Sequence, residues 1–298
     1  MSVPRRPLGR TGLEVPVLGH GTVPVGRSWF DPAAVRPLLD GLLAEGIDLF
    51  DTAAAYDDAE ERLGRALEGR RDHVVLVSKT GMDTGYASAW ERRQLQRLID
   101  RSLARLRTDH LDVLLLHTCT LEQLEHGEVI EVLQEAQRAG KARCIGYSGD
   151  GAALAFALRS GVFEVIEASY SLLDQANHDL LAQAHKEGVG VLLKRPLANA
   201  VPGRTTAPAN EYALPYWTRW QELGLTSADV EGLPWMEVAL RFAAFADGVD
   251  CALVGSGSLE HMRAHVRALR AGPLPATVAE RLRARFHAVG HQRWPGLT

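Results

Sequence analysis

Eight short apolar segments recur along the chain, and a longer stretch with apolar residues at helical spacing follows most of them. The short segments are β-branched or leucine-rich and are typical of strands. They lie at 17–22, 47–52, 74–79, 111–117, 143–148, 164–169, 190–195 and 251–255. Strands that alternate with helices indicate repeated βα units around a parallel sheet.

The helical stretches between the strands each carry an apolar stripe that can cover one pair of strands. The clearest stripes are Ala59, Leu63, Ala66 and Leu67; Leu95, Ile99, Leu103 and Leu106; and Leu259, Met262, Val266 and Leu269.

The length of 298 residues suits either two ordinary domains or one α/β barrel, which needs about 250 residues. The βα units continue without a Gly/Ser-rich linker, and closure of the sheet leaves no exposed edge. We therefore predict an α/β fold in which residues 1–298 form one (β/α)8 TIM barrel. Two departures from the repeat are a short N-terminal hairpin around Leu8–Pro16, which could plug the barrel bottom, and a long loop at 198–234, after strand seven.

Charge and composition argue against several classes of partner. The net charge is −4 and basic residues are interleaved with acidic ones, so no nucleic acid is expected. The N-terminus lacks the apolar stretch of a signal peptide, and no apolar run approaches the roughly 20 residues that span a bilayer. Three cysteines without metal-like spacing predict free thiols and no metal site. We expect a cytoplasmic protein with no membrane partner.

Polar residues stand at the ends of three successive predicted strands. Asp51 ends the second strand with Tyr56 five residues on, Lys79 ends the third, and His117 ends the fourth. Active sites of α/β barrels lie at the carboxyl ends of the strands. Strands are about 4.8 Å apart, so these four side chains can converge within roughly 10 Å. Lys79 and Asp51 should pair, because either charge alone in an apolar setting is costly.

These four side chains suit proton donation to a carbonyl oxygen. A nearby ammonium should lower the pKa of the Tyr56 phenol from about 10 and make it a general acid. Lys79 would tune Tyr56, Asp51 would orient Lys79, and His117 would hold the substrate oxygen or share the proton. None of these residues is a covalent nucleophile with its own base, so hydride transfer to a small-molecule carbonyl substrate is the favoured chemistry.

Three functions of different classes are compatible with such a barrel. The first is a carbonyl reductase, or the reverse alcohol dehydrogenase. The second is a catalytically weak barrel that binds nicotinamide and serves as a regulatory subunit, which the intact group of four residues argues against. The third is a lyase or isomerase that forms a Schiff base on Lys79, and it ranks last because a lysine beside Asp51 stays charged.

The segment Asp51–Gly64 (DTAAAYDDAEERLG) resembles the aldo-keto reductase signature D-T-A-x-x-Y-G-x-S-E-x-x-L-G, with Asp57 and Ala59 in place of the usual glycine and serine. Val77–Lys79 (VSK), Leu111–His117 (LDVLLLH) and Leu8–Thr22 match further family motifs in order. The resemblance implies a (β/α)8 barrel that binds NADPH in an extended pose without a Rossmann domain and reduces aldehydes or ketones.

The resemblance also implies the cofactor-binding positions. At the nicotinamide end, Ser148 matches the family, whereas Gly149 replaces an asparagine, for which Asp150 could substitute, and Glu167 replaces a glutamine. The remaining positions are Gly21, Thr22, Asp51, Lys194, Arg195, Pro196, Leu197, Gly255, Ser256, Gly257, His261 and His265. Lys194 stands where many members stack an aromatic ring on nicotinamide.

The 2′-phosphate of NADPH would lie at the helix that follows Gly255–Ser258, where backbone N–H groups are available. The usual cationic positions read Gly255 and His261, although Arg263 or Arg267 could compensate. We therefore expect NADPH to be preferred modestly and NADH to be accepted. For the substrate, the aromatic residues predicted to line a hydrophobic pocket are Trp29, Tyr86, Trp90 and Trp217.

Overall fold

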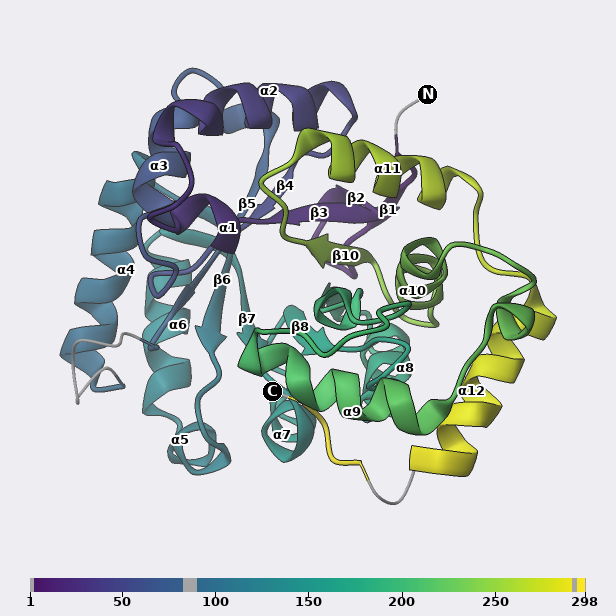
Figure 1. The fold of residues 1–298 in the computed structure, drawn as a ribbon. Helices are drawn as coiled ribbons and strands as arrows, with labels where there is room; N and C mark the ends of the chain where they lie inside the picture. The colour runs from purple at the N-terminus through teal and green to yellow at the C-terminus, as the bar shows by residue number, and fades with distance from the viewer. Residues whose placement is uncertain (1–2, 83–89, 291–293, 298) are drawn as a thin grey trace.

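The structure, a computed structural model, describes residues 3–82, 90–290 and 294–297. Eight parallel strands close into a barrel in the order β10-β3-β4-β5-β6-β7-β8-β9 (Figure 1). Their bounds are β3 Leu18–Gly21, β4 Leu49–Asp51, β5 Val75–Thr80, β6 Leu111–His117, β7 Ala142–Ser148, β8 Val165–Ser169, β9 Gly190–Lys194 and β10 Cys251–Val254. The predicted (β/α)8 barrel is confirmed, and each predicted strand overlaps one strand of the barrel.

Helices surround the barrel and bury their apolar stripes against it (Figure 1). Their bounds are α1 Val23–Gly26, α2 Val35–Ala44, α3 Ala59–Ala66, α4 Arg92–Leu106, α5 Leu121–His126, α6 Glu128–Arg138, α7 Gly151–Arg159, α8 His178–Lys186, α9 Leu214–Leu223, α10 Trp235–Ala244, α11 Leu259–Arg270 and α12 Ala276–Gly290. The predicted stripes lie on α3, α4 and α11. Within the described ranges, no helix combines the length and the apolarity needed to cross a bilayer.

An antiparallel hairpin of β1 (Arg5–Pro7) and β2 (Glu14–Pro16) closes the bottom of the barrel. Its side chains Leu8, Leu13 and Val15 are buried in one cluster with the first interior residues of the barrel strands. The predicted plug is confirmed, although its first strand, Arg5–Pro7, lies before the predicted start at Leu8.

The side chains of each barrel strand alternate between the interior and the surrounding helices. The interior cluster contains Leu49, Val75, Val77, Val113, Leu115, Cys144, Val165, Leu192, Cys251 and Leu253. At even spacing beyond these residues, on the same strands, stand Asp51, Lys79, His117, Ser148, Glu167 and Lys194. The alternation therefore turns these polar side chains into the carboxyl-terminal mouth of the barrel, where barrel active sites lie.

The long connection after β9 is present and contains a helix that the sequence analysis did not predict. Helix α9 lies in this connection, and its Arg219 packs against the C-terminal segment 294–297. The Arg219 guanidinium lies 5.2 Å from the centre of the Trp294 ring, and the Leu297 N–H donates to Asp174 Oδ2 at 2.7 Å. The connection and the C-terminal segment thus form one wall above the barrel.

The start of this connection has an unusual backbone. Ala198, Asn199 and Ala200 all have left-handed φ angles, of 46°, 54° and 57°. A side chain with a Cβ atom costs roughly 1–2 kcal/mol in this conformation, and glycine does not have this cost. Ala200 is exposed, so its methyl group contributes little packing.

Replacing Ala200 with glycine should therefore raise the free energy of unfolding by about 0.5–1 kcal/mol, because the relief of left-handed strain exceeds the entropic cost of glycine. Thermal denaturation should show a Tm higher by about 1–3 °C. The matched control is Ala104→Gly on the exposed side of α4, which should lower the stability by up to about 1 kcal/mol. A loss of stability in Ala200→Gly equal to that in the control would show that Ala200 is not strained.

Candidate active site

A buried ion pair lies at the mouth of the barrel. The Lys79 ammonium, on β5, donates to Asp51 Oδ1 at 2.5 Å and to the Thr52 carbonyl at 3.1 Å. Both side chains are almost completely excluded from solvent. The pairing predicted from the sequence is therefore present, and it compensates two charges that would each be costly alone.

Tyr56 and His117 lie next to this pair. Tyr56 follows β4 in a short turn, and the centre of its ring lies 5.0 Å from Lys79 Nζ. The His117 ring, at the end of β6, meets the Tyr56 ring edge to face with 5.6 Å between centres. The structure thus brings together the four side chains that the sequence singled out.

The turn that carries Tyr56 explains one departure from the family signature. Asp57 occupies the position of the usual glycine, and its φ angle is 45°, in the left-handed region that glycine prefers. Aspartate tolerates this region better than most residues. Its carboxylate is also 3.0 Å from Arg27 Nη1 in an exposed ion pair.

The pKa of Tyr56 differs in direction from the sequence prediction. Burial, together with the carboxylates of Asp51 and Glu167, raises the pKa of Tyr56 to about 12, although Lys79 acts in the opposite sense. The predicted lowering is wrong, because burial and the two carboxylates outweigh the ammonium. The phenol consequently remains protonated at neutral pH.

The His117 imidazole is buried and neutral. Burial, with Lys79 and Lys194 as nearby cations, lowers the pKa of His117 to about 3. Its Nδ1 atom is buried without a hydrogen-bond partner in the described part of the chain. A neutral ring beside Tyr56 can donate a hydrogen bond from its N–H to a substrate oxygen.

Two further polar side chains lie next to Lys79 and its partners, Ser148 at the end of β7 and Glu167 on β8. Ser148 Oγ donates to Glu167 Oε1 at 3.1 Å, and Glu167 Oε2 lies 3.2 Å from Lys79 Nζ. Lys79 therefore faces two carboxylates. Ser148 and Glu167 thus offer a hydroxyl and a carboxylate at the position where the resemblance implies the nicotinamide.

Gly149 can be explained by its neighbour Tyr147. A Cβ atom on Gly149 would lie 2.3 Å from the Tyr147 hydroxyl oxygen, which donates to the Cys119 carbonyl at 3.0 Å. The asparagine usual in the family would therefore collide with the tyrosine here.

Asp150, which could substitute for that asparagine, is bonded to protein groups. Its carboxylate accepts from the Ser169 N–H at 2.7 Å and from Asn177 Nδ2 at 2.7 Å. The same carboxylate lies 3.1 Å from Lys194 Nζ. Asp150 is thus occupied by protein groups, and the pair with Lys194 fixes the residue that stands at the usual stacking position.

The loop after β10 bonds mainly to itself and to the start of α11. Ser258 Oγ accepts from the His261 N–H at 3.3 Å as the N-cap of α11, and Ser256 Oγ accepts from the Ser258 N–H at 3.1 Å. Arg263 turns away to Glu45, with 2.9 Å between Nε and Oε1. The predicted compensation by Arg263 at a phosphate is therefore opposed by an existing ion pair.

The other predicted cofactor positions lie at the ends of β3, β9 and β10 or on α11. Thr22 is buried at the end of β3, and its N–H donates to the Asp51 carbonyl at 2.9 Å. The remaining ones are Gly21, Gly255 and Gly257 beside β3 and β10, Pro196 and Leu197 after β9, and the half-buried His265 on α11.

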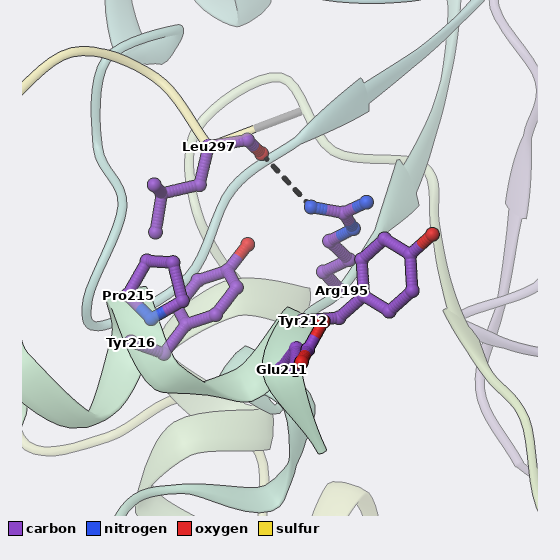
Figure 2. A pocket seen from close by; sticks show the side chains of 6 residues that line it. All are labelled: Arg195, Glu211, Tyr212, Pro215, Tyr216 and Leu297. Atoms are coloured by element: carbon purple, nitrogen blue, oxygen red, sulfur yellow. Dashed lines mark hydrogen bonds between the residues drawn. The ribbon is translucent and has the colours of Figure 1, made fainter.

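A cavity of 350 Å³ opens beside the end of β9 (Figure 2). Its lining consists of Arg195, Glu211, Tyr212, Pro215, Tyr216 and Leu297. Arg195 Nη1 donates to the Leu297 carbonyl at 3.1 Å and so joins the connection after β9 to the C-terminal segment. Tyr212 and Leu297 could not be predicted as lining residues from the sequence, because only the fold shows that these distant segments meet.

The predicted substrate residues do not gather in this cavity. Trp29 is 71% exposed and packs edge to face on Phe30, Trp90 lies against Gly81 just beyond β5, and Trp217 is half-buried on α9. Tyr86 lies outside the described residues.

Comparisons with known proteins agree with this geometry. The chain is 28% identical to L-galactose dehydrogenase of Arabidopsis thaliana over 89% of this chain and 87% of that protein. It is 29% identical to the NADH-specific methylglyoxal reductase of Escherichia coli over 64% and 66% of the two chains. The holo form of aldo-keto reductase AKR11C1 from Bacillus halodurans superposes with a TM-score of 0.82 at 27% identity, over 95% and 96% of the chains. The model of the Aldo/keto reductase family matches residues 17–285, and the chain therefore belongs to this family.

Proposed function

We propose that this protein reduces an aldehyde or ketone to the alcohol with NAD(P)H, and that Tyr56 is the general acid. The observation that supports this most is the cluster of Tyr56, His117, Lys79 and Asp51 at three neighbouring strand ends, with Lys79 Nζ 5.0 Å from the Tyr56 ring. Membership in a family of nicotinamide-dependent oxidoreductases supports the reaction class.

The residues at the mouth of the barrel fit a nicotinamide. When bound, the reduced nicotinamide supplies a hydride to the carbonyl carbon. Its carboxamide has donors and an acceptor, and Glu167 and Ser148 offer a carboxylate and a hydroxyl for them. Thr22 Oγ1 is a buried atom without a hydrogen-bond partner in the described ranges, so it can bond to a ligand, whereas Glu167 Oε2 already faces Lys79 at 3.2 Å. The Thr22 hydroxyl is therefore an unused polar group that supports a ligand at this position.

Tyr56 and His117 divide the work at the substrate oxygen. The proton moves from the Tyr56 hydroxyl to the carbonyl oxygen, and the Lys79 ammonium stabilises the phenolate that remains. His117 holds the oxygen by a hydrogen bond and does not supply a charge, since its pKa is lowered to about 3. Of the two roles considered for His117, the holding role is thus the one that the burial of the ring favours.

The function is tested with a panel of aldehydes, ketones and sugars and both reduced cofactors, by following the absorbance of the reduced nicotinamide. Turnover with at least one carbonyl compound supports the proposal. Tight NADPH binding with no turnover across the panel would instead indicate a regulatory barrel. Trapping of a carbonyl substrate by borohydride without cofactor would indicate a Schiff base on Lys79.

The preference for NADPH over NADH should be modest and should decrease with salt. The 2′-phosphate needs cationic partners, yet Arg263 is paired with Glu45, and the N-terminus of α11 contributes only about 0.3–1 kcal/mol. The NADH-specific relative from Escherichia coli agrees with acceptance of NADH. Dissociation constants for both cofactors at low and high salt measure the preference. A preference above about a thousandfold, or roughly 4 kcal/mol, would contradict a modest preference and reveal a dedicated phosphate clamp.

Glu45→Gln provides the matched variant for this measurement. Removing the carboxylate frees Arg263 to reach an incoming phosphate, so NADPH affinity should rise by up to about tenfold, which is one charge-assisted hydrogen bond. NADH affinity should stay unchanged, because NADH has no 2′-phosphate. Equal changes for the two cofactors would show that Arg263 does not face that phosphate.

A further inference from the structure

The Lys79 ammonium is shared by two carboxylates on opposite sides of the site. Asp51 Oδ1, from β4, lies at 2.5 Å and Glu167 Oε2, from β8, lies at 3.2 Å. All three side chains are buried, with at most 6% of each exposed. The resemblance to the family places an uncharged glutamine at the position of Glu167, so this chain carries one additional acid.

The surrounding groups do not neutralise this additional acid. Toward Glu167, β7 presents the uncharged Ser148, and β9 presents Lys194, which is already paired with Asp150 at 3.1 Å. His117 on β6 is neutral, as is Tyr56 after β4. With both acids ionised, the Asp51–Lys79–Glu167 cluster would therefore carry one uncompensated negative charge in a buried setting, which is energetically costly.

We infer that the Asp51–Lys79–Glu167 cluster holds one additional, shared proton at neutral pH, and that Glu167 is a positioning residue that controls through Lys79 how readily Tyr56 gives up its proton. This inference rests on the proposed function for its catalytic part only. The protonated cluster is electrically neutral, so it does not repel the negative charge that develops on the substrate oxygen. Loss of the shared proton leaves a net negative cluster beside Tyr56 and makes the phenol a weaker acid.

The direction of the pKa shifts agrees with this arrangement. Burial first and the Glu167 carboxylate second raise the pKa of Asp51 to about 8, against the attraction of Lys79. Unfolded Asp51 has its ordinary pKa of about 4, so the folded state holds an additional proton between about pH 4 and pH 8. Stability from this group is therefore lost as pH rises through that range and is constant above it.

Glu167→Gln tests the shared proton without any cofactor. The substitution keeps the shape of the side chain and removes its charge, so Asp51 should then form a simple ion pair with Lys79. We expect the Tm of the cofactor-free variant, relative to wild type, to increase by several degrees between about pH 5 and pH 8 and to level off above that. A difference in Tm that is independent of pH would overturn the shared proton.

The same variant tests the control of Tyr56 in the loaded enzyme. Wild-type kcat for aldehyde reduction should fall above about pH 8, and Glu167→Gln should lose this alkaline decline. The matched control is Glu60→Gln, which removes a buried carboxylate that accepts from Ser78 Oγ at 2.7 Å and should retain the decline. The same alkaline decline in Glu167→Gln and wild type would overturn the catalytic part. If wild type reduced no carbonyl compound, the proposed function would fail, whereas the Tm measurement would still decide the shared proton.

Discussion

Replacing Tyr56 with phenylalanine should lower kcat for aldehyde reduction by about 10²–10⁴-fold, which is the usual contribution of a general acid. The change removes the hydroxyl and keeps the ring that meets His117 edge to face, so fold and cofactor affinity should be preserved. Steady-state kinetics, a thermal melt and a cofactor titration measure the three effects.

The matched control is Tyr170→Phe, which makes the same change at a fully buried tyrosine stacked on Phe242, away from the four clustered residues. Its kcat should stay within a few-fold of wild type. If Tyr56→Phe also remained within a few-fold of wild type on an aldehyde, Tyr56 would not be the proton donor.

Lys79→Met should have the second largest effect, because it removes both the support of the phenolate and the partner of two buried acids. Breaking a buried ion pair from one side costs roughly 3–5 kcal/mol, and chemical denaturation should show a loss of that size near neutral pH. Reductase activity should fall together with stability. The loss of stability should be smaller at about pH 5, since Asp51, whose pKa burial raises, is then protonated more easily.

A double variant separates the two consequences of losing Lys79. Adding Asp51→Asn to Lys79→Met removes one of the unpaired carboxylates, so part of the stability should return while the activity stays low. Wild-type stability in Lys79→Met at neutral pH would contradict the account of the buried pair. An unchanged pH profile of the residual activity would show that Lys79 does not tune the acid.

The positions of the catalytic candidates were predictable because strand alternation determines them. Apolar residues at Val75 and Val77 point into the barrel, so Lys79, two residues on, points into it as well. The same argument holds for Asp51 after Leu49. Local sequence thus contained both the strand and the direction of the side chain.

The electrostatics of the site could not be predicted in the same way. The pKa of Tyr56 depends on Glu167, more than 100 residues away, and on burial that exists only in the closed barrel. The ion pair of Arg263 with Glu45 likewise joins α11 to the end of α2. These contacts depend on which segments meet in space, and no local pattern indicates them.

The wall above the barrel could not be predicted from the sequence either, for a different reason. Proline, glycine and tryptophan in 198–234 indicated a loop, yet α9 forms there and packs against the C-terminal segment through Arg219 and Trp294. Tertiary packing outweighed local propensity in this connection. The cavity beside Arg195 follows from that packing and has no signature in the sequence.

Carbonyl reduction at this site is best tested by the fate of a deuterium label. An aldehyde that the protein consumes is incubated with reduced cofactor deuterated at the transferable C4 position of the nicotinamide, and the alcohol is examined by mass spectrometry. Direct hydride transfer predicts that deuterium is found on the carbinol carbon with wild type, and that Tyr56→Phe forms the same labelled product far more slowly. An alcohol that carries no deuterium, or cofactor that stays unconsumed while the carbonyl compound disappears, would contradict carbonyl reduction by this site.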